Sequence, residues 1–167
     1  MKPSAMDAAA FVKAFGGIFE HSPWIAEGAW AAGIGPTGDT ADGLHAALCQ
    51  VFRAADAERR RGVLLAHPDL AGRLAVRGGL TPESTAEQAS AGLDRCTAEE
   101  FRRFTELNDA YKARFGFPFI MAVKGRSRAE ILEAFERRVH NGAEEEFATA
   151  CAQVERIALL RLKDLLP

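Results

Sequence analysis

Signals that begin α-helices recur along this 167-residue chain. Thr81-Pro82 places a cap residue before a proline at the first helical position, and Thr97 and Ser127 are each followed three residues later by glutamate, the spacing of a capping box. Alanine outnumbers valine, isoleucine and threonine together, which favours helix over strand. We therefore expect an all-α fold, a compact bundle of about eight helices. The expected helices lie at about 6–20, 23–32, 40–55, 57–67, 82–91, 98–114, 128–140 and 143–165.

Length and charge narrow the class of protein further. The length fits one domain, residues 1–167. The formal net charge is -2 with acids and bases interspersed, so we expect neither a nucleic-acid partner nor a membrane partner. Cys49, Cys96 and Cys151 are odd in number and form no CxxC pair, which argues against a disulfide framework or a zinc site. Free thiols, together with an amino end that lacks a signal-peptide core, suggest a cytoplasmic protein.

One apolar stretch does not fit a helix. Gly116 is typical of a helix end, and Pro118 disfavours helical backbone at Phe117. We therefore expect an extended, non-helical segment near 116–124. Its backbone N–H and C=O groups lack helix partners, and each one buried unpaired costs about 1–3 kcal/mol. Either neighbouring side chains or a polar ligand must satisfy them.

Two polar residues interrupt apolar helix faces. Arg161 lies in the stripe formed by Val154, Ile157, Ala158 and Leu165. It is either a structural residue, paired with a buried carboxylate or snorkelling to the surface, or an anion site for a carboxylate or ureido group. Asn108 shares a face with Phe104, Tyr111 and Phe115. We expect its amide to tie down the backbone of 114–127.

Polar groups also gather near 67 and 84. If a helix starts at Thr81, Ser84, Glu87 and Gln88 share one of its faces, which suits a small polar heterocycle. The alternative is that Ser84 and Glu87 form only a helix-start capping box. His67 ends an expected helix before Pro68 and is either a helix-end residue or a proton-transfer group.

Five motifs along the chain are informative together. They are FEHSPWIAE (19–27), HPDLAGR (67–73), LTPESTAEQASAGLD (80–94), FTELNDAYKARFGFPFIMAVKGRSRAEIL (104–132) and VERIALLRL (154–162). In this order, and over nearly the whole chain, they resemble the OHCU decarboxylase family, where OHCU is 2-oxo-4-hydroxy-4-carboxy-5-ureidoimidazoline, an intermediate of urate breakdown.

The resemblance implies an all-helical carboxy-lyase that converts OHCU to (S)-allantoin without a cofactor or metal, and it implies a homodimer. It assigns catalysis to His67, and with the polar face above we add Glu87. Which of the two transfers the proton stays open. The substrate-binding residues implied are Pro68, Ser84, Thr85, Ala86, Glu87, Gln88, Phe119, Ile120, Met121, Ala122, Val123 and Arg161.

Two other functions are compatible with an all-helical chain. A hydrolase of ureido compounds would need a metal or an activated nucleophile, and neither metal-ligand spacing nor a Ser-His-Asp arrangement is present in the sequence. A helical interaction module would expose apolar grooves and would not need Arg161 in a core stripe. The resemblance favours the decarboxylase over both.

Overall fold

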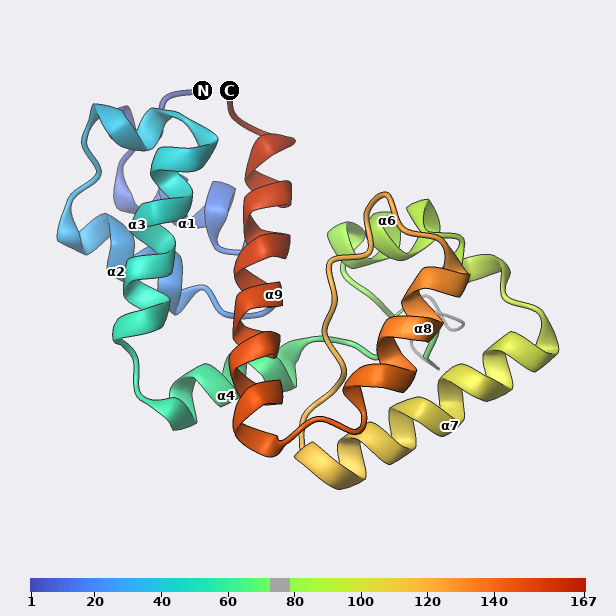
Figure 1. Cartoon of the computed structure of the whole chain (residues 1–167). Coiled ribbons are helices and arrows are strands. Elements are labelled where there is room, and N and C mark those ends of the chain that lie inside the picture. The colour runs from blue at the N-terminus through green and yellow to red at the C-terminus, as the bar shows by residue number, and fades with distance from the viewer. Residues whose placement is uncertain (73–78) are drawn as a thin grey trace. The chain divides into compact units, whose positions relative to one another are not determined.

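The computed structural model describes residues 1–72 and 79–167, and the regular secondary structure of these residues is helical (Figure 1). The all-α prediction is confirmed. The α-helices are α1 (Ala8–Phe15), α2 (Trp24–Ala32), α3 (Ala41–Ala54), α4 (Ala57–Ala66), α6 (Pro82–Ser90), α7 (Ala98–Phe115), α8 (Arg128–Arg138) and α9 (Ala143–Lys163). Short 3-10 helices are η1 (Pro3–Ala5), η2 (Pro36–Asp39) and η3 (Leu93–Arg95).

The helix-start signals at Thr81, Thr97 and Ser127 act as the sequence predicts. The Thr81 hydroxyl accepts from Ser84 N–H at 3.2 Å, and complete capping boxes open α7 at Thr97 and α8 at Ser127. The first helix is shorter than predicted: α1 ends at Phe15, and the glycine pair 16–17 follows it. Glycine loses more backbone entropy in a helix than other residues do, which explains the early end.

The contacts divide the chain into two compact units. The first comprises residues 1–66 and 154–167, and in it α2 packs against both α1 and α3. Its core is aromatic and aliphatic, with Phe11, Phe15, Phe19, Leu44, Leu48 and Phe52 all buried. That the chain forms one domain stays a prediction.

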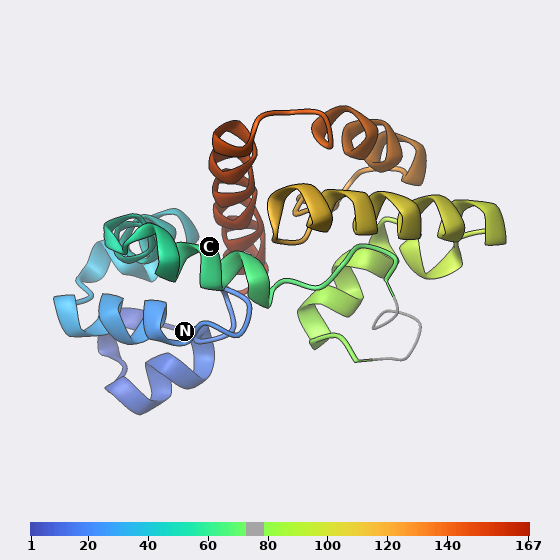
Figure 2. The same ribbon diagram turned by 90° about the horizontal axis from the view of Figure 1, so that it is seen from below.

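The second unit comprises residues 67–153, and in it α7 contacts both the turn near Leu70 and α8. Figures 1 and 2 show residues 116–127 leaving the end of α7 and returning to the start of α8 without helical turns. Gly116 ends α7 in the left-handed conformation (φ 77°), so the predicted cap and the non-helical segment are confirmed. Aromatic side chains fix this return, because Phe119 stacks on Phe135 of α8 with ring centroids 3.9 Å apart.

Candidate active site

His67 stands directly after the end of α4. The helix ends at Ala66, one residue earlier than predicted, and Pro68 disfavours any continuation. His67 is 9% exposed, so its imidazole is held largely within the protein. The turn that follows contains a left-handed residue that is not glycine, Ala71 (φ 50°). Arg73, the last residue of the HPDLAGR motif, lies outside the described residues.

Gln88 of α6 fastens this turn. Its Oε1 accepts from Ala71 N–H at 3.0 Å, and its Nε2 donates to the Asp69 carbonyl at 3.1 Å. Lys112 adds an ion pair to the Asp69 carboxylate at 2.7 Å. The side-chain amide therefore joins α6 to the residues just beyond His67-Pro68. Both polar atoms of the Gln88 side chain therefore bond to main-chain groups. The prediction of a polar face for a ligand did not anticipate these bonds.

The predicted polar face of α6 is present in the structure. Ser84 and Gln88 are buried, Glu87 is half-buried, and Thr85 and Ala86 are exposed. Because the Thr81 hydroxyl starts the helix, neither Ser84 nor Glu87 is its N-cap.

Asn108 makes a different contact from the one predicted. It is buried on the predicted face of α7, but its Nδ2 donates to the Leu70 carbonyl at 3.0 Å and not to the 114–127 backbone. The Asn108 Oδ1 is buried, and none of the described residues donates a hydrogen bond to it. Like Gln88, Asn108 holds the turn after His67. The sequence could not show this because the two residues are 38 positions apart.

The 119–123 segment receives side-chain partners at two of its backbone groups. The Ile120 carbonyl accepts from Arg138 Nη1 at 2.8 Å, and Ala122 N–H donates to Gln153 Oε1 at 2.9 Å. Among the residues that the structure describes, the N–H groups of Phe119, Ile120 and Met121 have no acceptor within hydrogen-bonding distance. Side chains therefore satisfy some of these backbone groups, as the first alternative predicts, and a polar ligand for the others stays a prediction.

A buried ion pair that the sequence analysis missed supports this segment. Arg138 Nε donates to Glu146 Oε1 at 2.8 Å, and the same carboxylate accepts from the Tyr111 hydroxyl at 2.6 Å and from Asn141 Nδ2 at 3.1 Å. Burial, followed by the hydrogen bond to Glu146, raises the pKa of the Tyr111 hydroxyl well above its usual value. The test applied to Arg161 would have singled out Arg138 as a buried charge, because Arg138 continues the apolar stripe of Ile131, Ala134 and Phe135.

Arg161 lies in the first unit and is paired with an acid there. Its Nη2 contacts Glu20 Oε2 at 2.7 Å, and its Nη1 donates to the carbonyls of Gly17 at 3.1 Å and Ile18 at 3.4 Å. Both charged side chains are almost fully buried. These contacts fit the structural alternative for Arg161. The predicted stripe is correct except for Leu165, which follows the end of α9 and is 45% exposed.

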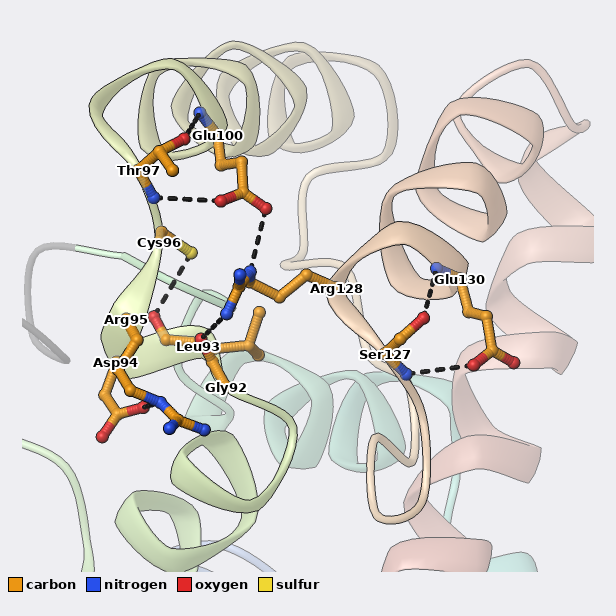
Figure 3. Close-up of polar contacts among 10 residues, drawn as sticks. All are labelled: Gly92, Leu93, Asp94, Arg95, Cys96, Thr97, Glu100, Ser127, Arg128 and Glu130. Carbon is orange, nitrogen blue, oxygen red and sulfur yellow. Dashed lines mark hydrogen bonds and ion pairs between the residues drawn. The ribbon is translucent and has the colours of Figure 1, made fainter.

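Arg128 joins the ends of the two segments expected to bind substrate. Figure 3 shows its guanidinium between the Glu100 carboxylate and the Gly92 carbonyl, at 2.9 Å and 3.1 Å. Gly92 closely follows α6, and Arg128 is the first residue of α8 after 119–123. Gly92 has φ 75°, and a Cβ added there would lie 2.9 Å from Arg128 Nη1.

In the part of the chain described, no group of three or more His, Cys, Asp or Glu side chains is arranged to hold a metal ion. In the same residues, no helix is long and apolar enough to cross a membrane.

A family model described as OHCU decarboxylase matches residues 4–163. The chain belongs to the OHCU decarboxylase family. It is 42% identical over 159 residues to the 2-oxo-4-hydroxy-4-carboxy-5-ureidoimidazoline decarboxylase of Halalkalicoccus jeotgali, which covers 95% of this chain and 86% of that relative. It is 37% identical over 161 residues to the uric acid degradation bifunctional protein PucL of Bacillus subtilis, covering 96% of this chain and 31% of the larger protein.

Two solved structures are similar to this chain. The crystal structure of (S)-allantoin synthase matches with a TM-score of 0.76 and 30% identity over 98% of this chain, which spans 52% of that one. A crystal structure of OHCU decarboxylase in the presence of (S)-allantoin matches with a TM-score of 0.72 and 24% identity, covering 90% of this chain and 95% of that one. The second likeness supports the fold.

Proposed function

We propose that this chain decarboxylates 2-oxo-4-hydroxy-4-carboxy-5-ureidoimidazoline to (S)-allantoin in urate breakdown. The observation that carries the proposal is the match of the OHCU decarboxylase family model to residues 4–163. The Gln88 contacts support it, because they fasten the polar face of α6 to the turn that follows His67-Pro68. This family membership favours the decarboxylase over both the metal-dependent hydrolase and the interaction module.

The substrate can provide the electron sink for this reaction. Loss of carbon dioxide leaves an electron pair on the ring, and that pair delocalises toward the ring imine to give an enediol-like or enamine-like intermediate. The protein then has to orient the scissile carboxylate, stabilise the shifting charge and deliver one proton to one face of the ring. Protonation from one side produces a single enantiomer, whereas spontaneous decay gives racemic allantoin.

His67 and Glu87 are the proposed proton-transfer groups. An imidazole can take the substrate hydroxyl proton and return one to the ring, a role worth about 10²–10⁴-fold. Glu87 would hold the ureido or hydroxyl group and keep the imidazole or the substrate in the required protonation state. Backbone N–H groups of 119–123 would stabilise negative charge that develops on the substrate. Pro68, the Ser84 to Gln88 stretch and Arg161 stay predicted substrate contacts.

The test is a coupled assay that generates OHCU in situ and follows the optical activity of the allantoin formed. We expect the wild-type chain to give (S)-allantoin and His67→Asn to lower kcat by about 10²-fold or more with the helical circular dichroism unchanged. Glu87→Gln keeps the shape of the side chain, and we expect it to lower kcat as well. Full turnover by His67→Asn would show that His67 has no role in the reaction. Wild-type kinetics in Glu87→Gln would show the same for Glu87.

We also infer that the protein is a cytoplasmic homodimer. The family resemblance supports the dimer, and the three free thiols fit a reducing compartment. Sedimentation of the purified chain measures its oligomeric state directly. A monomer that turns over OHCU would contradict the dimer and leave the decarboxylase proposal standing.

A further inference from the structure

Arg138 makes three kinds of contact at once. Its Nε pairs with Glu146, its Nη1 donates to the Ile120 carbonyl, and its guanidinium carbon lies 4.3 Å from the centroid of the Phe119 ring. The remaining nitrogen, Nη2, is buried and has no hydrogen-bond partner in the part of the chain that the structure describes. Glu146 is fully buried and Arg138 is 6% exposed, so the charges compensate each other inside the protein. This arrangement fixes the position of the guanidinium against the 119–120 backbone.

The contact with Ile120 sets the direction of the next amide. The described residues contain no cis peptide bond, so the Ile120 carbonyl and the Met121 N–H point to opposite sides of one planar unit. Holding the carbonyl against Arg138 therefore turns the Met121 N–H away from Arg138. Ile120 is 2% exposed and Met121 is half-buried. Among the described residues no acceptor satisfies the Met121 N–H, so it is left for an outside partner.

We propose that Arg138 is a positioning residue for the decarboxylation, which aims the Met121 N–H at an anionic or carbonyl oxygen of the substrate. The inference rests on the proposed function of 119–123 as a substrate-binding segment. A cation on the carbonyl side also polarises the peptide group, which makes its N–H a stronger donor. Arg138 touches no substrate in this account and acts through the backbone.

The chemistry of the contact requires arginine. Its planar fork presents several N–H donors in fixed directions, so one side chain can bond Glu146 and Ile120 and still lie over an aromatic ring. A lysine ammonium is a point charge and cannot keep all three contacts in that geometry. The adjacent Arg137 is exposed and provides a matched control on the same helix.

The experiment compares three variants. Arg138→Met combined with Glu146→Gln removes both buried charges together, which avoids an unpaired carboxylate. Tyr111→Phe removes one hydrogen bond to Glu146 and leaves the Arg138 contact with Ile120 in place. Arg137→Met is the surface control. We expect the double variant to lower kcat by about tenfold or more with little change in KM, because the aimed N–H acts mainly in the transition state.

Tyr111→Phe distinguishes positioning from simple stabilisation. We expect Tyr111→Phe to lower the unfolding temperature while keeping kcat within about twofold of the wild type. Arg137→Met should keep kcat within the same range. If Tyr111→Phe loses as much kcat as the double variant, the ion pair is only structural and the proposal is wrong. Wild-type kcat in the double variant would also overturn it. If the double variant does not fold, Arg138→Lys replaces it. We expect the same loss of kcat in Arg138→Lys, and wild-type kcat in this variant would overturn the proposal.

A second measurement does not depend on turnover. In an amide NMR spectrum, (S)-allantoin should shift the Met121 signal of the wild type and of Tyr111→Phe, but not that of the charge-neutral double variant or of Arg138→Lys. A wild-type chain that shows the Met121 shift with allantoin and does not consume OHCU would contradict the proposed function, but not the inference that Arg138 orients the Met121 N–H toward a bound ligand. A Met121 signal that shifts equally in all variants would contradict the role of Arg138.

Discussion

Gln88 and Asn108 are short polar side chains that act on main chain. Gln88 bonds the backbone on both sides of Leu70, and Asn108 bonds the Leu70 carbonyl. Three consecutive backbone units after His67-Pro68 are thus held by side chains from α6 and α7. A loop fixed in this way keeps the orientation of the residues that enter it, which a proton-transfer group requires.

Removing the Gln88 amide should loosen this turn. Gln88→Met has a similar volume and leaves the Ala71 N–H and the Asp69 carbonyl without their partner. We expect a loss of about 1–3 kcal/mol in the free energy of unfolding, measured in urea, together with a lower kcat. The control is Gln50→Met, since Gln50 is exposed on α3. Equal stability in the two variants would show that the Gln88 contacts contribute nothing net.

The sequence identified which residues were unusual more easily than it identified their partners. Arg161 and Asn108 stand out because each interrupts an apolar face, and both are buried in the structure. Their partners, Glu20 and the Leu70 carbonyl, lie 141 and 38 residues away, where periodicity along one helix gives no information. Glu146 also interrupts an apolar helix face, since it lies four residues before Ala150 in the buried stripe of α9.

At the scale of elements, the first turns of α7 and α8 are joined. Glu100 closes the capping box of α7 and also pairs with Arg128, the first residue of α8. Figure 3 shows both capping boxes with Arg128 beside them. Backbone and side-chain hydrogen bonds at Thr97 and Arg128 lower the pKa of the Glu100 carboxyl below its ordinary value of 4.5. The ionised form is therefore the one that folding favours.

This shift predicts a pH-dependent contribution to stability. A carboxyl with a lowered pKa stabilises the folded state above its ordinary pKa, and the contribution is lost as the pH falls through the lower, folded value. We expect the wild type to unfold at a higher temperature than Glu100→Gln at pH 7, and the difference to shrink below about pH 4.5. A difference that stays constant from pH 7 to pH 3 would show that the charge of Glu100 is unimportant. Glu99→Gln, on the exposed side of the same turn, is the control.

At the scale of the whole molecule, α9 belongs to both compact units. Its 21 residues begin in the unit of residues 67–153 and end in the unit that includes 154–167. Each unit holds roughly half of the helix, and isolated helices shorter than about 12–15 residues are marginal in water. Loss of either unit removes the packing of its half of α9, and because helix formation is cooperative along the chain, it also removes the turns that adjoin the other half. The two units should therefore unfold together.

Two buried cysteines can report on this coupling. Cys49 lies in the first unit and Cys151 in the second, and burial raises the pKa of the Cys49 thiol to about 12, so it reacts slowly in the native state. Pulsed alkylation across a urea series, read by mass spectrometry, should give one midpoint for both thiols. Separate midpoints would show that the units unfold independently.

The global fold was more accessible to prediction than its subdivision. Caps at Thr81, Thr97 and Ser127 depend on neighbours within three residues, and the structure has them as predicted. The division between residues 66 and 67 depends on contacts across the chain and leaves no local signal. For the same reason the sequence marked the 116–124 segment as non-helical but did not reveal Arg138 as its support.

Gly92 imposes a constraint on how this chain can evolve. Its backbone is left-handed, a conformation that glycine adopts without strain and most other residues do not. Any side chain at this position would also crowd the Arg128 guanidinium, which connects the residue after α6 with the first turns of α7 and α8. Its neighbours Asp94 and Arg95 are exposed and have no such restriction. A lineage that diversifies this surface can therefore change those two positions freely, while position 92 stays restricted to glycine and the few residues that adopt a left-handed backbone.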